Sequence, residues 1–113
     1  MYIYREFDIF GVGRVPALVI DNRNTVDIKN SSYYYTQLPE GMHTAFFVKY
    51  TTGVNELITE TLTGETIKSA AVRFEVKSGN NYYIKVDYGD AYLDLVTEEE
   101  GQKGVSDCES LTQ

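Results

Sequence analysis

The sequence predicts a mainly β protein: one antiparallel β-sandwich domain over residues 1–113, with about seven or eight strands and a short C-terminal helix over 97–109. The first observation behind this prediction is composition, because ten tyrosines and five phenylalanines occur with no tryptophan and only two prolines. The second is that these aromatic residues lie in short apolar runs, several of which alternate with polar residues at period two. The third is that turn residues separate the runs.

Short strands are expected in the first third of the chain, at residues 2–7, 15–21, 26–28 and 31–38. The strand over 15–21 is apolar on both faces apart from Pro16. Pro16 has no N–H to donate to a ladder, so it belongs at the start of this strand or on an edge. The turn residues Asp21-Asn22-Arg23-Asn24 follow the strand.

A hairpin is expected where the Tyr-rich strand over 31–38 meets the strand over 43–50. Pro39 has a fixed φ and Gly41 a permissive one, and they lie between two runs rich in aromatic and β-branched residues. Residues 51–65 show only weak periodicity and contain glycine breaks, so they are expected to form an extended connection.

Three consecutive strands, over 70–76, 82–88 and 91–96, are expected to form a meander. The first two flank the turn Ser78-Gly79-Asn80-Asn81, which predicts a hairpin. Alternation assigns each strand one buried face. The residues expected to point inward are Ala70, Val72, Phe74, Val76, Tyr82, Ile84, Val86, Tyr88, Ala91, Leu93 and Leu95.

A helix is expected to start at the run Thr97-Glu98-Glu99-Glu100. This run matches the capping box, in which Thr97 accepts from the N–H of Glu100 and the glutamates lie near the positive helix terminus. Val105, Cys108 and Leu111 recur at a spacing of three and form the stripe expected to dock on the sheet. Gly101 and Gly104 each weaken the helix by about 1 kcal/mol relative to alanine.

Charge and cysteine content exclude several classes of protein. The net charge of -7 repels phosphate backbones and anionic lipid surfaces, so no nucleic-acid partner is expected. No apolar run reaches the roughly 20 residues that span a bilayer, so no direct membrane insertion is expected. Cys108 is the only cysteine, which excludes an intrachain disulfide and a multi-thiolate metal site.

No residue pattern predicts catalysis, so we expect the protein not to be an enzyme and to use no metal or cofactor. Gly11-Val12-Gly13-Arg14 lacks the following helix that a phosphate loop needs, and is interpreted as a loop between strands. The carboxylates Glu98 to Glu100 are explained by helix capping, and Asp87, Asp90 and Asp94 by turn formation. His43 is interpreted as a hydrogen-bonding residue at the end of a strand.

The surplus of tyrosine is the positive signal for binding. Consecutive Tyr33, Tyr34 and Tyr35 cannot all face the core, and Tyr83 and Tyr92 lie opposite the inward sets of their strands. These rings could cover an outer sheet face or lie under the helix, contact a protein partner or a second copy, or bind a sugar or another small ligand. We expect Tyr83 and Tyr92 to be exposed, so the replacement of either by serine should cost well under the roughly 3 kcal/mol or more that truncating a buried aromatic residue costs.

Motifs along nearly the whole chain resemble the domain-of-unknown-function family of small bacterial envelope lipoproteins. The residues that carry the resemblance are Ile3-Tyr4-Arg5, Val19-Ile20-Asp21-Asn22, the run from Tyr33 into Leu-Pro-x-Gly-x-His ending at His43, the hairpin at 77–84, Leu93-Asp94-Leu95-Val96 and Glu98 to Gly101. The segment from Leu38 to His43 also looks like the PEGA-type β-sandwich modules of surface-layer proteins.

The resemblance implies a transthyretin-like or immunoglobulin-like sandwich that is tethered at the cell envelope through a lipidated cysteine after a signal peptide. It brings no catalytic residues. This sequence departs from the family in having neither a leader nor an N-terminal cysteine, so the expectation is an envelope or periplasmic protein, or a cytoplasmic one if Met1 is the native start. The expected function is that of a non-catalytic protein-interaction or structural module, with a carbohydrate- or small-ligand-binding domain as the alternative.

Overall fold

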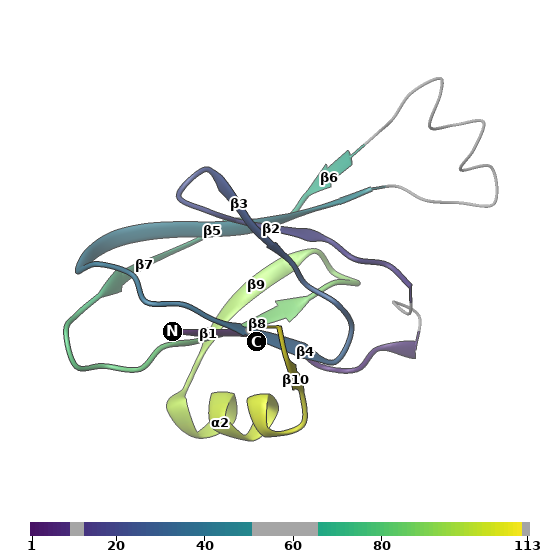
Figure 1. The fold of residues 1–113 in the computed structure, drawn as a ribbon. Coiled ribbons are helices and arrows are strands. Elements are labelled where there is room, and N and C mark those ends of the chain that lie inside the picture. The colour runs from purple at the N-terminus through teal and green to yellow at the C-terminus, as the bar shows by residue number, and fades with distance from the viewer. Residues whose placement is uncertain (10–12, 51–65, 112–113) are drawn as a thin grey trace.

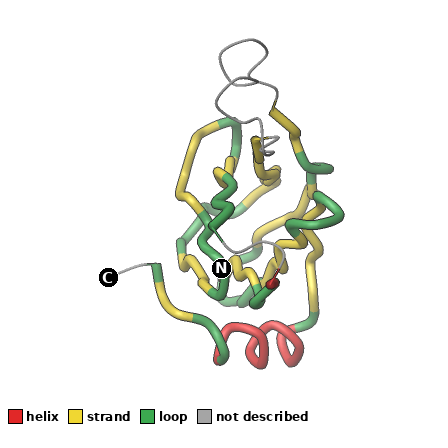
Figure 2. Tube along the Cα trace, turned by 90° about the vertical axis from the view of Figure 1, so that its right-hand side faces the viewer, coloured by secondary structure: helices red, strands yellow, loops and turns green. Residues whose placement is uncertain are grey.

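The computed structural model describes residues 1–9, 13–50 and 66–111, and the protein is mainly β with two sheets and a short helix. The sheets lie in two layers, and the helix covers the outer side of one of them (Figures 1 and 2). The expected connection over 51–65 and part of the glycine loop at 11–14 lie outside the described residues.

Sheet A has five strands in the order β10 (Glu109–Ser110), β4 (Ser32–Tyr35), β1 (Tyr2–Arg5), β8 (Tyr83–Asp87) and β9 (Tyr92–Val96). Sheet B has the order β3 (Arg23–Asp27), β2 (Ala17–Ile20), β5 (Gly41–Tyr50) and β6 (Thr66–Lys68), and β7 (Val72–Val76) also pairs with β5. Two strands pair with different parts of one edge of the long strand β5: β7 pairs with Gly41–Ala45, and β6 pairs with Val48–Tyr50.

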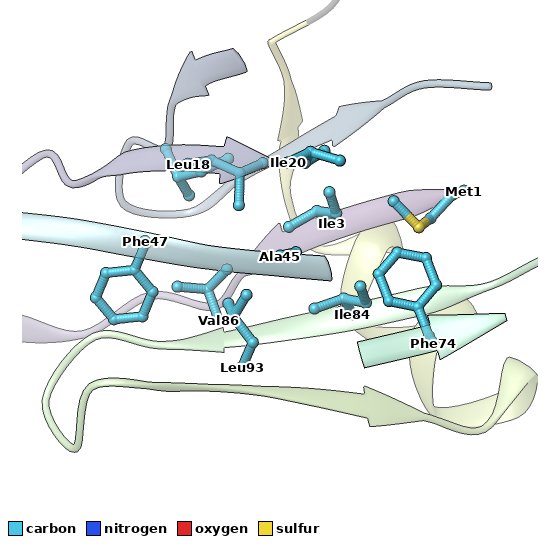
Figure 3. Packing of buried hydrophobic residues seen from close by; sticks show 11 residues of the cluster. Met1, Ile3, Leu18, Ile20, Ala45, Phe47, Phe74, Ile84, Val86 and Leu93 are labelled. Atoms are coloured by element: carbon cyan, nitrogen blue, oxygen red, sulfur yellow. The ribbon is translucent and has the colours of Figure 1, made fainter. Parts of the chain in front are cut away.

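The hydrophobic core lies between the two sheets. Alternation on each strand sends one set of apolar side chains into this space, as Figure 3 shows for ten of them. Sheet A contributes Ile3, Ile84, Val86 and Leu93, and sheet B contributes Leu18, Ile20, Ala45, Phe47 and Phe74. The alternation predicted for 72–76 and 82–88 is confirmed, since Tyr82 and Tyr88 also pack against this core.

Two residues of the predicted inward set are exposed. Leu95 has 43% of its surface exposed, because β9 is the edge strand of sheet A. Ala70 is exposed because it precedes β7 and joins the sheet only through an isolated bridge to Tyr92.

Two predicted hairpins are wrong. The turn that contains Pro39 and Gly41 connects β4 in sheet A to β5 in sheet B, and the turn at 78–81 connects β7 in sheet B to β8 in sheet A. Turns that contain Pro, Gly or Asn can connect two strands of one sheet or two strands of different sheets. Which connection forms depends on how the apolar faces of the strands pack on the two sides of the core. Of the predicted meander only the β8–β9 hairpin is confirmed.

The sheets are not antiparallel throughout, which corrects another part of the predicted fold. Strand β1 lies between β4, to which it is antiparallel, and β8, to which it is parallel. Strand β10, which the sequence did not indicate, adds in parallel to β4. Parallel neighbours come from distant parts of the chain, so no local turn signal marks them.

The turn after β2 is tighter than predicted. Asp21 and Asn22 both have positive φ, at 51° and 65°, and chain reversal at these two residues lets β3 begin at Arg23 rather than at residue 26. Asp and Asn tolerate this left-handed conformation better than most residues, and two such residues form the two-residue turn that suits a hairpin. Pro16 comes directly before β2, as its missing N–H requires.

Helix α2 (Glu98–Ser106) is confirmed, and Thr97 is its N-cap, accepting a hydrogen bond from the N–H of Glu100 at 3.2 Å. The predicted docking stripe is wrong, because Cys108 follows the helix and the buried helix residues are Gly101 and Gly104. A Cβ at Gly104 would lie 2.2 Å from a ring carbon of Tyr4, and one at Gly101 would lie 2.1 Å from Cγ of a sheet tyrosine, Tyr83. The two glycines therefore let the helix backbone lie directly on the rings of sheet A.

Candidate binding surface

Strand register gathers four tyrosines on the outer face of sheet A, the face that α2 also covers. Tyr2 of β1 pairs with Tyr35 of β4 on one side and with Tyr83 of β8 on the other. Tyr33 pairs with Tyr4, two residues further along β1, and so shares the same face. We call Tyr2, Tyr33, Tyr35 and Tyr83 the tyrosine face.

Tyr2 is the centre of the tyrosine face. Its ring stacks on that of Tyr83, with centroids 5.1 Å apart and 6° between the planes. The ring of Tyr35 lies 4.8 Å away and that of Tyr33 lies 5.9 Å away, both tilted by more than 50°. Such offset and tilted pairs add about 0.5–1.5 kcal/mol each beyond their buried area, so the rings support one another.

The exposure predicted for Tyr83 is wrong. Its side chain does lie on the outer face, but helix α2 covers that point and leaves only 5% of it exposed. Tyr2, Tyr33 and Tyr35 are half-buried and present their remaining surface to solvent. Tyr2 was not among the sequence candidates, although the alternation of Tyr2 and Tyr4 with Ile3 and Arg5 carried the signal.

Tyr34 and Tyr92 do not belong to the tyrosine face. Tyr34 points to the other side of β4 and packs against the core, as alternation predicts for the middle of three consecutive tyrosines. Tyr92 is exposed on the outer face, with 40% of its surface accessible, but it lies at the far end of β9 from Val96, the residue paired with Tyr83.

His43 is a structural residue. It is 8% exposed, its Nδ1 lies 2.6 Å from Oδ2 of Asp21, and its Nε2 lies 2.7 Å from the carbonyl oxygen of Pro39. Both partners are acceptors, so both ring nitrogens act as donors and the imidazolium form is favoured. The hydrogen bonds to Asp21 and Pro39 raise the pKa of His43. The hydrogen bond between His43 and Asp21 also lowers the pKa of Asp21.

Asp21 completes a link between the β2–β3 turn and strand β5. Its Oδ1 accepts from the N–H of Thr44 at 3.0 Å, and its own N–H donates to the carbonyl of Thr44 at 2.9 Å. The sequence interpretation of His43 as a hydrogen-bonding residue at a strand end is confirmed, and neither nitrogen is left to accept a proton from a substrate.

The hydroxyl of Tyr4, which lies beneath the helix, and the thiol of the half-buried Cys108 are held in their neutral forms. Burial is the largest cause that raises the pKa of the Tyr4 hydroxyl to about 12 and that of the Cys108 thiol to about 11. The thiol donates to the carbonyl of Arg5 at 3.5 Å. A neutral thiol is a poor nucleophile, so Cys108 has the character of a packing residue.

Arg5 is the largest buried side chain, at 1% exposed, and it joins three parts of the fold. Its Nη1 donates to the carbonyls of Arg14 and Ile28, at 2.7 and 3.0 Å. The guanidinium carbon also lies 4.7 Å from the centroid of the Tyr88 ring. These contacts offset part of the cost of burying the charge.

The turn predicted for the three aspartates is found for two of them. Asp87 accepts from the N–H of Asp90 at 2.9 Å, whereas Asp94 lies within strand β9 and not in a turn. Glu98 accepts from the side chain of Gln102 along the helix. Within the described ranges, no group of three or more His, Cys, Asp and Glu side chains is arranged to hold a metal ion. None of the described residues form a helix long and apolar enough to cross a bilayer.

A groove lies at the end of the molecule where the β4–β5 and β7–β8 connections meet. Its volume is about 440 Å³. We call it the end groove, and its lining residues are Met1, Tyr35, Gln37, Leu38, Glu40, Val76, Lys77, Ser78, Gly79, Asn80, Asn81 and Tyr82.

Comparison with known proteins identified no relative of this chain. No protein-family model matches the chain, and the searches of curated proteins and of solved structures also gave no match.

Proposed function

We propose that this protein is a non-catalytic interaction module whose contact surface is the exposed part of the tyrosine face, formed by Tyr2, Tyr33 and Tyr35. The observation that carries the proposal is that three tyrosine rings lie partly exposed on the solvent side of a sheet, with those of Tyr33 and Tyr35 both packed against that of Tyr2. An outer face needs only polar residues to stay in water. Adjacent tyrosines instead supply rigid, amphipathic contact area, which is the chemistry enriched at protein interfaces.

The conformations of these side chains favour binding. Each tyrosine has only two side-chain torsions, and contact with neighbouring rings restricts them before a partner arrives. Tyr83 gives the surface a fixed base, since it is buried under α2 and stacks on Tyr2. A partner that covers Tyr2, Tyr33 and Tyr35 therefore orders few additional groups.

We propose a non-catalytic role because the side chains best suited to catalysis are engaged in structural contacts. The imidazole of His43 is occupied at both nitrogens, and the thiol of Cys108 is half-buried with a raised pKa. The two strongest candidates for a base and a nucleophile in the described part of the chain thus have structural roles in this proposal.

We also propose that the two facing sheets form a transthyretin-like or immunoglobulin-like sandwich and that the protein acts in a bacterial envelope. Two five-stranded sheets around one core, with connections that pass between them, support the sandwich. The envelope setting rests on the sequence resemblance alone, and fractionation of the native cells tests it.

Site-specific photocrosslinking tests the interaction. A benzophenone amino acid replaces Tyr33 in the full chain, expressed in the cells that naturally carry the gene, and Arg73 on the exposed face of β7 is the matched control position. Irradiation should give a discrete protein adduct from position 33 that weakens strongly when Tyr2 is also changed to serine. An adduct of twice the chain's mass would identify a second copy as the partner.

The proposal fails if position 33 gives no more adduct than position 73, provided both variants unfold at the same denaturant concentration as the natural chain. It also fails if the adduct persists unchanged when Tyr2 is replaced, because the rings would then not act as one surface.

A further inference from the structure

A second surface, which shares only Tyr35 with the protein interface proposed above, has the size and chemistry of a ligand site. The end groove has a volume of about 440 Å³, within the roughly 300–1,000 Å³ of small-molecule pockets. All its lining residues are described, and they comprise Met1, the ends of β4 and β7, and the two connections between the sheets. Figure 1 shows these two connections at the same end of the molecule.

Hydrogen bonds between and within the two connections hold the groove in shape. The N–H of Ser78 donates to Oε1 of Glu40 at 3.0 Å, which joins one wall to the other. The N–H of Lys77 donates to the hydroxyl of Tyr82 at 2.9 Å, and Gly79 turns the chain at a φ of 82°. A site that is ordered before binding loses little entropy when a ligand enters.

The polar lining is rich in amides. Gln37, Asn80 and Asn81 each offer both donors and an acceptor, which is the pattern that matches neighbouring hydroxyl groups on a ligand. The side-chain amides of Gln37 and Asn80 donate to the hydroxyls of Tyr35 and Tyr82 at 3.5 Å, and such long, weak bonds are readily exchanged for bonds to ligand hydroxyls.

The remaining lining sets the charge and the apolar part of the ligand. Lys77 and Glu40 are the charged side chains of the groove, and their formal charges cancel. The lining residue Met1 adds its amino group, which donates to the carbonyl of Thr36 at 2.9 Å and whose pKa burial lowers. The net charge of the lining is therefore small, and no cluster of cations is present to hold a strongly charged ligand such as a phosphate. Tyr35 and Tyr82 add aromatic rings, which can pack against the apolar C–H face of a sugar.

We propose that the end groove binds a neutral saccharide, with Gln37, Asn80 and Asn81 recognising its hydroxyl groups and Tyr35 and Tyr82 packing against its ring. The size of the groove, its hydrogen-bonded walls, its low net charge and its combination of amides with aromatic rings together favour this class of ligand. Tyr35 borders both the end groove and the tyrosine face, so residues that belong to only one surface must separate the two functions.

Nuclear magnetic resonance titration of the full chain tests the proposal. The probes are maltotriose, cellotriose and chitotriose, followed by backbone amide shifts. At least one should give saturable shifts at residues 77–82 and 37–40, and the double variant Asn80→Ala, Asn81→Ala should weaken that binding about tenfold or more, the loss expected when one or two good hydrogen bonds go. Tyr33→Ser, on the tyrosine face alone, should leave the saccharide affinity unchanged.

Saturable shifts that stay away from the groove, or binding that survives in the Asn80/Asn81 double variant, would overturn the proposal, as would the lack of saturable shifts with all three probes. Both asparagines are exposed, so their replacement should not unfold the chain, and the amide spectrum checks this directly. Failure here leaves the photocrosslinking at position 33 as a separate test, because Asn80 and Asn81 take no part in the tyrosine face.

Discussion

Replacing Gly104 by alanine should destabilise the protein, although the same change stabilises most helices. In an exposed helix interior, alanine is favoured over glycine by about 1 kcal/mol. Here the new Cβ would lie 2.2 Å from Cε2 and 2.7 Å from Cζ of Tyr4, a ring with no exposed surface. Relief requires the helix to move away from sheet A.

The expected loss can be worked out from these two opposing effects. Overpacking in a filled interior costs about 1–3 kcal/mol or more, and the severe overlap with Tyr4 places this variant at or above the upper end. Subtracting the gain in helix propensity leaves a net loss of about 2 kcal/mol. For a domain of this size, that loss lowers the melting temperature by roughly 8 °C.

Urea unfolding followed by circular dichroism measures this effect, with Gly89→Ala as the matched control. The nearest non-neighbouring atom to a Cβ at Gly89 is Oδ1 of Asp87 at 3.8 Å, an ordinary contact, so this control should change the free energy of unfolding by less than about 0.5 kcal/mol. A Gly104→Ala protein as stable as the natural chain would refute the packing of α2 on Tyr4.

The remaining predictions concern single side chains. Tyr83→Ser should cost about 3 kcal/mol or more and Tyr92→Ser less than about 1 kcal/mol in urea unfolding, because the first ring is buried and the second is 40% exposed; equal losses would contradict the assigned positions. The His43–Asp21 contact raises one pKa and lowers the other, so its contribution to stability should be complete between the ordinary values of 3.8 and 6.5. That contribution should be lost as pH rises through the folded pKa of His43 and as pH falls through that of Asp21, and Asp21→Asn should flatten both limbs of the stability profile. A thiol reagent at pH 8 should modify Cys108 much more slowly in the folded chain than in urea, since its pKa is raised to about 11; equal rates would show an accessible thiolate.

Local pattern was sufficient to predict most of the strands and most of their buried residues. Alternation places Phe74, Ile84 and Val86 in the core, and Thr97 followed by Glu100 predicts the start of the helix. These features depend on residues close together in sequence, so a single chain contains the whole signal.

Pairing between distant segments could not be predicted in the same way. The Pro39–Gly41 turn gives a reversal, but whether β5 pairs with β4 or crosses to another sheet depends on the partners available to both strands. The parallel insertion of β1 beside β8 has no local signature at all.

The composition of the tyrosine face could be predicted only in part, because it also depends on contacts between distant segments. Tyr83 is on the face that alternation predicts, yet its burial depends on α2, and the docking of α2 depends on Gly101. Glycines that look like weak points in a helix are here the residues that permit close contact. Tyr2 joined the site only because β1 brings it between Tyr35 and Tyr83.

The most direct test of the account is a nuclear Overhauser measurement between the tyrosine rings. The ring protons of Tyr2 should show contacts to those of Tyr35 and Tyr83, whose centroids lie 4.8 and 5.1 Å away. Strong contacts along β4 to β5 in their place, with none from Tyr2 to Tyr83, would mean that β4 and β5 form a hairpin and that the tyrosine face does not exist.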